Sequence, residues 1–384
     1  MRRSLLLALF LAAFLAAPTL RAQGSPGARA VLDYLAARPA DVAMISYSVG
    51  ADGEPLTDDP VIAHRADREM SLASVAKLLV AGAYALEVDA ARLSPEELVP
   101  VGVWDHYYLG LDHHAEALRE LGIATDELGF ASDPSTPVAL ESMARAMIRW
   151  SDNAAFDYFV GRLGQPAIAA AAAAAGIPFY GPYLPYSGTD LVWYSHVDGP
   201  LAGDKLLDLL ALDRGTYEAR VAERLALAAD PEWAAAELEW RIDGGDARDF
   251  DREATAVRAF DHRAPARAVA RFLAQIASDR FGSPAASARV RDLIDSGARP
   301  PGPFDYWGRK GGSLAAVLDD ASVFFVAHGD FAGRKRVTVV FISGIWQPLW
   351  ELAQADPSLL FEFEVNVALD RGFAAEVATR LQEP

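Results

Sequence analysis

The sequence contains no cysteine and very little lysine. Four of its 35 basic residues are lysine, at positions 77, 205, 310 and 335, and the others are arginine. The absence of cysteine excludes disulfides, a cysteine nucleophile, a thiolate metal site and a lipid-modified cysteine anchor. Stability must therefore come from the packed core, and a chain of 384 residues is long enough to form a large one.

Basic residues are fewer than acidic residues, and the formal net charge is −18. Binding to nucleic acid or to an anionic membrane surface depends on clustered lysine and arginine. The composition therefore argues against both kinds of partner and is typical of a soluble acidic protein.

The N-terminal apolar run is too short for a membrane-spanning helix. It covers 13 residues, Leu5–Ala17, against the roughly 20 that a bilayer requires. It follows Arg2 and Arg3 and precedes a stretch of small residues that ends near Ala22. This pattern predicts a cleaved secretory signal peptide over residues 1–22 and a periplasmic or secreted protein without a stable membrane anchor. An uncleaved anchor is the alternative interpretation.

Strand patterns occur near both ends of the sequence, and helical patterns fill the middle. This order predicts one antiparallel sheet built from both chain ends, in a sheet lobe of about residues 28–70 and 262–384. The elements expected there are helices at Ala28–Ala37 and Glu364–Leu381, and strands at Val42–Val49, Val61–His64, Ala321–Ala327 and Arg336–Ile342.

A mostly helical lobe is expected over residues 75–260. Its apolar patterns predict a buried helix starting at Ser74, helices on both sides of Ser151-Asp152-Asn153, and an alanine-rich helix at Ala167–Ala175. Residues 198–261 are richer in Ala, Asp, Glu and Arg, which we interpret as an insertion or lid. The expected class is therefore α/β (α+β), with residues 23–384 forming one domain.

Two of the four lysines stand in motifs that also contain serine. Ser74 and Lys77 are three residues apart, so on a helix they share one face and lie within reach of a proton transfer. Lysine can lose its proton when buried, whereas arginine cannot. Lys310-Gly311-Gly312-Ser313 stands beside a strand, where glycines let the backbone approach a reacting carbonyl.

Each motif also has a plain structural explanation as a helix cap or a glycine-rich turn. The order Ser-x-x-Lys, Ser-Asp-Asn and Lys-x-Gly is much more specific, and it resembles class A β-lactamases and penicillin-binding proteins. The resemblance covers most of residues 28–382 apart from the insertion. It implies a class A β-lactamase-like fold and a serine acyl-transfer site.

The resemblance implies a role for each motif residue. Ser74 would be the acylated nucleophile, Lys77 its base or proton relay, and Ser151 the proton donor to the leaving nitrogen. Asn153 would bind the amide side chain of the substrate, and Lys310 would act on Ser151 and attract a carboxylate. The oxyanion hole would consist of the backbone N–H groups of Ser74 and Ser313, with Gly312 allowing the close approach and Asp152 bracing the loop.

The sequence departs from the family pattern at two positions. No glutamate occurs between Asn153 and Glu218, where class A enzymes carry the residue that activates water for deacylation. Asp190 is the acid nearest the expected place, either as a substitute base or as a loop cap. Gly311 stands where the family usually has Thr or Ser, which removes a hydroxyl for the substrate carboxylate.

Weaker patterns complete the set of hypotheses. Asp105-His106 and Asp112-His113-His114 match no zinc signature, so we expect no metal, and the motifs imply no cofactor. Gly311–Ala315 departs from the Gly-x-Ser-x-Gly elbow of α/β-hydrolases. Trp104, Tyr107 and Tyr108 are candidates either for the cavity lining or for the core.

The sequence thus predicts an exported, monomeric serine hydrolase acting on a small β-lactam or a cell-wall-like peptide. A D-amino-acid peptidase or esterase on the same fold is one alternative. A penicillin-binding or sensor protein that deacylates slowly is the other, and the missing glutamate favours it.

Overall fold

The computed structural model describes residues 24–110, 113–179, 181–297, 302–356 and 358–382. The expected signal peptide and Asp112 lie outside these residues. Within the described part, no helix is both long and apolar enough to span a bilayer.

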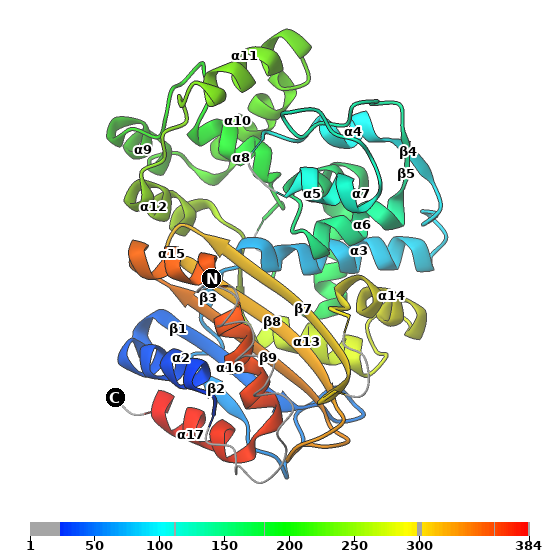
Figure 1. The fold of residues 1–384 in the computed structure, drawn as a ribbon, viewed down its shortest axis with the longest axis vertical. Helices are drawn as coiled ribbons and strands as arrows, with labels where there is room; N and C mark the ends of the chain where they lie inside the picture. The colour runs from blue at the N-terminus through cyan, green and yellow to red at the C-terminus, as the bar shows by residue number, and fades with distance from the viewer. Residues whose placement is uncertain (1–23, 111–112, 180, 298–301, 357, 383–384) are drawn as a thin grey trace, which may run out of the picture.

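A five-stranded antiparallel sheet forms the lower half of the molecule in Figure 1. Its strand order is β2-β1-β9-β8-β7, so strands from the start of the chain pair with strands from its end. The predicted fold class, with a sheet assembled from both chain ends, is confirmed. The strands are β1 (Val42–Ser48), β2 (Ile62–His64), β7 (Phe304–Leu314), β8 (Val317–Val326) and β9 (Lys335–Ser343).

Helices cover both faces of this sheet, which explains why every residue of β1 is buried. The helices α2 (Pro26–Ala37), α16 (Ser358–Leu369) and α17 (Arg371–Gln382) lie on one face, and α13 (Ala266–Ala277) lies on the other. Residues along β8 alternate between the two resulting cores: Phe324 packs in the first and Val323 in the second.

The helical lobe stands above the sheet in Figure 1 and is built around α3 (Lys77–Asp89). Helix α3 is apolar on nearly all sides and buries nine consecutive residues, from Lys77 to Ala85. Around it lie α6 (Leu140–Arg149), α7 (Asn153–Ala175) and α14 (Pro284–Ile294). The lobe also contains α4 (Val101–Asp105), α5 (His114–Glu120) and the strand pair β4 (Leu98–Pro100) with β5 (Pro137–Ala139). A second strand pair, β3 (Glu69–Ser71) with β6 (Arg263–Pro265), lies beside the sheet and contacts β9 and α13.

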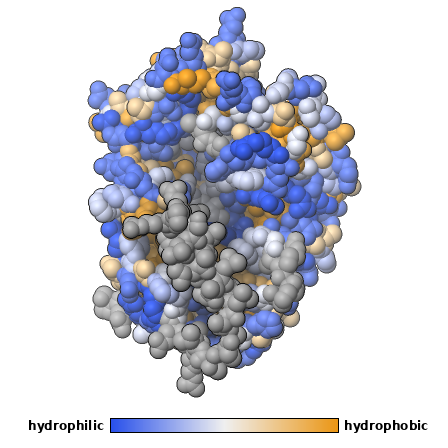
Figure 2. All heavy atoms as spheres, in the orientation of Figure 1, coloured by the Kyte–Doolittle hydropathy of each residue, from blue (hydrophilic) through white to orange (hydrophobic). Residues whose placement is uncertain are grey.

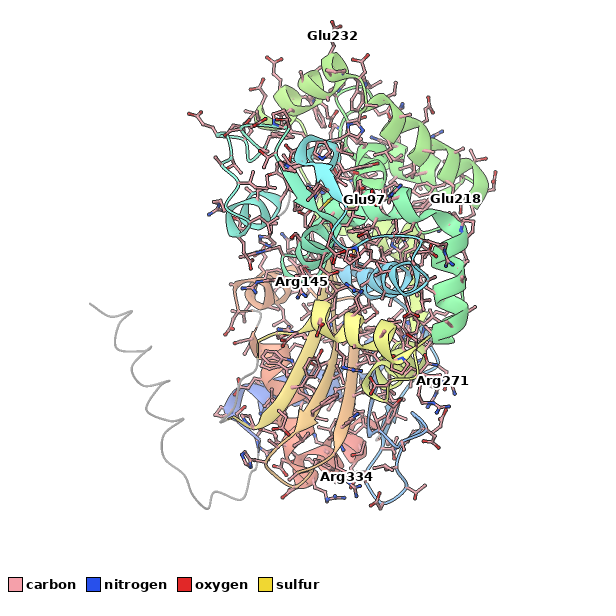
Figure 3. All side chains as sticks on the ribbon, turned by 90° about the vertical axis from the view of Figure 1, so that its right-hand side faces the viewer. Glu97, Arg145, Glu218, Glu232, Arg271 and Arg334 are labelled. Atoms are coloured by element: carbon pink, nitrogen blue, oxygen red, sulfur yellow. The ribbon has the colours of Figure 1, made fainter. Side chains whose placement is uncertain are left out.

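The region expected as an insertion forms a small helical unit whose apolar cluster also includes Ala73, residues of α8 (Tyr186–Trp193) and Val317 of β8. It contains α9 (Gly203–Leu210), α10 (Arg214–Leu227), α11 (Pro231–Ile242) and α12 (Phe250–Phe260). Tyr217 stacks on Phe260 with ring centroids 3.9 Å apart. Glu232 marks this unit at the top of Figure 3, at the end of the molecule opposite Arg334, and Glu218 marks it lower down at the right.

Helix α15 (Gln347–Ala355) is the least buried helix near the sheet, and none of its residues is fully buried. It follows β9 and lies at the upper left of the sheet in Figure 1. The face of the molecule seen in Figure 2 is mostly hydrophilic, as the net charge of −18 leads one to expect.

Four predicted boundaries differ from the structure. Ser74 lies in the 3-10 turn η2 (Ala73–Ala76), and the α-helix begins only at Lys77. The Lys310 motif lies within β7, which begins six residues before it. The alanine-rich helix is the continuation of α7 beyond a kink at Gly164, where φ is 73°. The expected closing helix is two helices, because the Asp370 carboxylate accepts the N–H groups of Gly372 and Phe373 and starts α17.

Candidate active site

Ser74 lies in a turn whose backbone is fixed from two sides. Its neighbour Ala73 has a left-handed φ of 41°, which costs energy for a residue with a Cβ. The Asp261 carboxylate accepts the N–H of Ala73 at 2.9 Å, and the Tyr186 hydroxyl donates to the Ala73 carbonyl at 2.5 Å. These contacts hold the turn and place Ser74 at the edge of a cavity.

Lys77 is completely buried and lies at the centre of the motif residues. Its Nζ donates to Ser74 Oγ at 2.9 Å, to the Ser151 carbonyl at 2.8 Å and to Asn153 Oδ1 at 2.6 Å. It also lies 3.3 Å from Ser151 Oγ. The first two motifs, far apart in sequence, therefore meet at a single ammonium group.

Lys310 reaches the same serine from the sheet side. Its Nζ donates to Ser151 Oγ at 2.9 Å and to the Gly311 carbonyl at 2.7 Å. Burial, together with the nearby charge of Lys77, lowers the pKa of Lys310 well below its usual value of 10.5. Ser151 thus has a lysine on each side, an arrangement suited to passing a proton along the row Ser74, Lys77, Ser151 and Lys310.

The Ser151 turn is strained and is held by buried carboxylates. Ser151 has a φ of 57°, and Asp152 begins α7 by accepting the N–H of Ala155. The second oxygen of Asp152 contacts His114 Nδ1 at 2.9 Å, and His114 Nε2 contacts Asp105 at 2.8 Å. Asp105 and His114, which the sequence offered as possible metal ligands, are therefore engaged in a buried hydrogen-bonded bridge to Asp152. Within the described residues no group of three or more His, Cys, Asp or Glu side chains could hold a metal ion.

Gly312 brings β7 against the nucleophile turn. A Cβ at this position would lie 2.8 Å from the Ser74 nitrogen and 2.9 Å from the Leu72 carbonyl oxygen, closer than real Cβ contacts allow. Glycine is therefore required here for the strand to approach Ser74. The next residue, Ser313, donates its hydroxyl to Gln354 of α15 at 3.0 Å.

The loop that enters α8 (Tyr186–Trp193) faces the site opposite the sheet. Buried Asp157 anchors it by accepting the N–H groups of Tyr186 and Ser187 at 2.6 and 2.7 Å, together with the Ser187 hydroxyl. Burial raises the pKa of Asp157 to about 7. The Tyr186 ring lies 5.1 Å from Lys77 Nζ, and burial raises the pKa of its hydroxyl well above 10.

Asp190 lines the second cavity of the site and is held by two arginines. Arg241 and Arg248 form ion pairs with its two oxygens at 2.8 and 2.7 Å. Burial acts to raise the pKa of Asp190, but the two guanidinium groups outweigh it and hold the pKa below its usual value. A carboxylate stabilised in this way is a poor proton acceptor.

The aromatic candidates divide between core and cavity. Trp104 and Tyr108 pack on the buried His114 ring, with ring centroids 4.8 and 4.6 Å away. Tyr107 instead lines the cavity that also contains Asp190.

Two cavities meet at the site. One of about 500 Å³ is lined by Ser74, Ser151 and the Gly311–Ser313 segment, and one of about 340 Å³ by Tyr186 and Asp190. Asn153, Ser313 and Gln354 line both cavities. The motif residues therefore lie at a junction in a cleft, as expected for a binding site.

Several residues that shape the site had no clear signal in the sequence. Asp157, Tyr186 and Asp261 act through contacts far along the chain, so no local spacing identifies them. His114 was visible, but in a pattern that invited a metal interpretation. Gln354 stands in an ordinary amphipathic helix.

Comparison with known protein families identifies a family that matches most of the chain. Residues 47–332 match the β-lactamase enzyme family. Among solved structures, the chain is similar to a β-lactamase from Sphaerobacter thermophilus (16% identity, 93% of this chain and 98% of that chain covered, TM-score 0.49). It is also similar to PBP-A (13%, 94% and 96%, 0.47) and to a β-lactamase from Chitinophaga pinensis (14%, 92% and 97%, 0.44). No curated protein matches the sequence.

Proposed function

Because the chain belongs to the β-lactamase enzyme family, we propose that it is a serine hydrolase that forms an acyl-enzyme at Ser74. The observation that carries the proposal is the buried Lys77 ammonium, which contacts Ser74, Ser151 and Asn153 together. A structural lysine would need neither a serine three residues away nor a second lysine beyond Ser151.

The acylation step follows from these contacts. Lys77 first gives up a proton to solvent, because only its neutral amine can act as a base. Ser74 Oγ then attacks the carbonyl carbon of an amide or ester, and its proton passes to Lys77. The bond from the carbonyl carbon to the leaving nitrogen or oxygen then breaks, and Ser151 gives its proton to the leaving group. Lys77 restores the proton of Ser151, and Lys310 stabilises the negative charge that develops on Ser151 during the transfer.

Charge on the carbonyl oxygen needs its own donors. The backbone N–H groups of Ser74 and Ser313 are our candidates, because Gly312 brings β7 to contact distance of the Ser74 nitrogen. The pair would complete an acylating site without any cofactor.

Deacylation requires a base that activates water, and the described residues near Ser74 provide no good candidate for this base. Tyr186 contacts the first motif from the loop side, and its hydroxyl is held neutral by burial and engaged on Ala73. A neutral phenol with a raised pKa is a poor base for activating water. We therefore propose that the acyl-enzyme is long-lived with β-lactams, which supports the slow-deacylating alternative over a fast antibiotic-degrading enzyme.

The substrate class follows from the same features. The site suits a β-lactam or a cell-wall-like peptide in which Asn153 binds an amide. A peptidase or esterase activity on the same scaffold remains the second candidate, because Gly311 offers no hydroxyl to a substrate carboxylate. We propose that the protein acts as a monomer in the periplasm or outside the cell after removal of residues 1–22.

The test is intact-protein mass spectrometry of residues 23–384 mixed with a penicillin and a cephalosporin, from seconds to hours, with Ser74→Ala as control. We expect an adduct that Ser74→Ala lacks and that persists for many minutes. Loss of the adduct within seconds would establish a true β-lactamase. An adduct of equal yield on Ser74→Ala would refute the nucleophile, and labelling of Ser74 only by simple esters or peptides would select the second candidate.

A further inference from the structure

The larger cavity continues well beyond the catalytic residues. From Ser74 and Ser151 it passes β7 and extends between α2, the ends of β8 and β9, and α15. We call this distal part the apolar chamber. It is lined chiefly by Val31, Leu318, Ile345, Leu349, Leu352 and Leu360.

The missing side chain at Gly311 opens the way into the apolar chamber. Residues alternate faces along a strand, so Lys310 and Gly312 face the nucleophile while Gly311 belongs to the other face. A Cβ at Gly311 would meet no atom closer than 3.6 Å, unlike one at Gly312. At Gly311, therefore, no side chain of β7 stands between Ser74 and the apolar chamber.

The positive charge of Arg309 at this entrance is compensated. Arg309 pairs with buried Asp320 at 2.5 Å, and its guanidinium also lies 5.2 Å from the centre of the Phe361 ring. A cation that is already paired has little need of an anionic ligand. The entrance therefore gives no reason to expect a carboxylate in the apolar chamber.

Helix α15 presents apolar surface that the protein itself leaves uncovered. Leu352 lines the apolar chamber, yet 56% of its surface is exposed to solvent. Leu349 lines the same wall and is only half-buried. Covering such surface with an apolar ligand group is favourable, because it removes that surface from water.

The position of the apolar chamber relative to Ser151 indicates which part of a substrate would enter it. In the proposed reaction Ser151 donates its proton to the leaving group, and Ser151 lines the larger cavity but not the smaller one. The leaving group therefore lies toward the larger cavity, of which the apolar chamber is the distal part. Asn153, the proposed partner of the acyl amide, also lines the other cavity, toward Tyr186.

We propose that the apolar chamber binds an apolar chain or ring on the leaving-group side of the substrate. The preferred substrates would then be esters or amides whose alcohol or amine portion is long and apolar. This inference rests on the proposed acylation of Ser74.

Two matched series of esters test the proposal. In 4-alkylphenyl acetates, from methyl to octyl, only the leaving group grows and the pKa of the phenol barely changes. In phenyl alkanoates only the acyl chain grows. We expect kcat/KM to rise by up to roughly fourfold per methylene in the first series, the value for burying a methylene group, and much less in the second.

Two variants tie the effect to the apolar chamber. Leu352→Gln makes its wall polar, and Gly311→Thr fills its entrance, so both should reduce the ratio of octyl to methyl rates by at least fivefold. Leu207→Gln is the matched control, since Leu207 is 69% exposed on α9 and does not line the cavity. It should leave the ratio unchanged.

Binding without catalysis separates this proposal from the proposed function. In Ser74→Ala, calorimetry should show 4-octylphenol binding at least tenfold more tightly than phenol, and Leu352→Gln in that background should remove most of the difference. Equal binding of the two phenols, or a chain-length effect confined to the acyl series, would overturn the proposal. Failure of every ester to label Ser74, with 4-octylphenol still bound in the apolar chamber, would count against the proposed function alone.

Discussion

At the scale of single residues, each of the four lysines is engaged by the backbone. The Nζ of Lys77 donates to the Ser151 carbonyl, that of Lys310 to Gly311, that of Lys205 to Trp193 and Gly199, and that of Lys335 to Ala277. Arginine carries the surface charge. Lysine is thus kept where a compact group with rotatable donors fits into a buried space.

Replacing Lys77 by arginine should abolish the proton transfer. Arginine does not give up its proton, so we expect Lys77→Arg to lower the rate of Ser74 acylation by at least roughly 100-fold, the usual contribution of a general base. The adduct formed with a penicillin, timed by mass spectrometry, measures this. Lys335→Arg, away from the site, should acylate at the unaltered rate, and a Lys77→Arg variant that does so too would refute the role of Lys77.

Asp157 should make stability depend on pH. Its folded-state pKa of about 7 lies above the usual 3.8, so the protonated form favours the folded state. Its contribution is complete below about pH 4 and is lost as the pH rises through about 7. The difference corresponds to at most about 4 kcal/mol, since each pKa unit is worth about 1.4 kcal/mol.

Asp157→Asn removes that titration while keeping most of the shape. We expect the free energy of unfolding of Asp157→Asn, relative to the unaltered protein, to rise by several kcal/mol between pH 4 and pH 7 and then to level off. Urea unfolding across this range measures it. A difference that stays constant with pH would show that Asp157 does not titrate there.

At the scale of elements, β7 and the nucleophile turn depend on each other through two adjacent glycines with different surroundings. A Cβ at Gly312 would clash with the backbone of the turn, whereas one at Gly311 would make only ordinary contacts, at 3.6 Å or more. Because the atoms near Gly312 are main-chain atoms, they cannot move aside without displacing Ser74.

Alanine substitutions should separate the two positions. Gly312→Ala should cost about 1–3 kcal/mol of stability, typical of overpacking, and slow Ser74 acylation by at least tenfold. Gly311→Ala should keep the melting temperature within about 2 °C, since its Cβ would have ordinary contacts. Differential scanning calorimetry checks both, and equal melting temperatures for the two variants would contradict the close approach at Gly312.

The insertion is joined to the α8 loop by a buried ion network around Arg241. This guanidinium pairs with Asp190 and Glu237 and donates to the Tyr194 carbonyl at 2.9 Å. Arg241→Gln would leave two carboxylates without their partner, so we expect a loss of about 3–5 kcal/mol. Arg252→Gln removes an exposed pair on α12 and should change stability by less than about 1 kcal/mol. Similar losses in both variants, measured by urea unfolding, would argue against the network.

At the scale of the whole molecule, the sequence was a good guide to class and a partial guide to detail. The sheet built from both chain ends was predictable because strand patterns occur near both ends of the sequence. The proximity of Ser74, Ser151 and Lys310 was predictable because their motifs occur in the order typical of the family. The helix break at Asp370 and the role of Asp157 could not be predicted. Both depend on which carboxylate reaches which N–H group in three dimensions. The apolar chamber could not be predicted from the sequence, because a leucine that lines a cavity has the same sequence pattern as one that faces a core.

Export is a further prediction about the whole chain. Expression of residues 1–384 in a Gram-negative host should yield a periplasmic protein whose intact mass lacks about the first 22 residues, because the apolar run is the length of a signal peptide. Leu9→Arg, which interrupts that run, should keep the full-length chain in the cytoplasm. A periplasmic product that retains residue 1 would indicate an uncleaved anchor.

The scarcity and burial of lysine have a practical consequence for handling the protein. Lys77 and Lys310 are buried, Lys205 and Lys335 are partly buried, and the Nζ of each donates to a carbonyl. Reagents that modify accessible primary amines would therefore find the terminal α-amino group as their principal target.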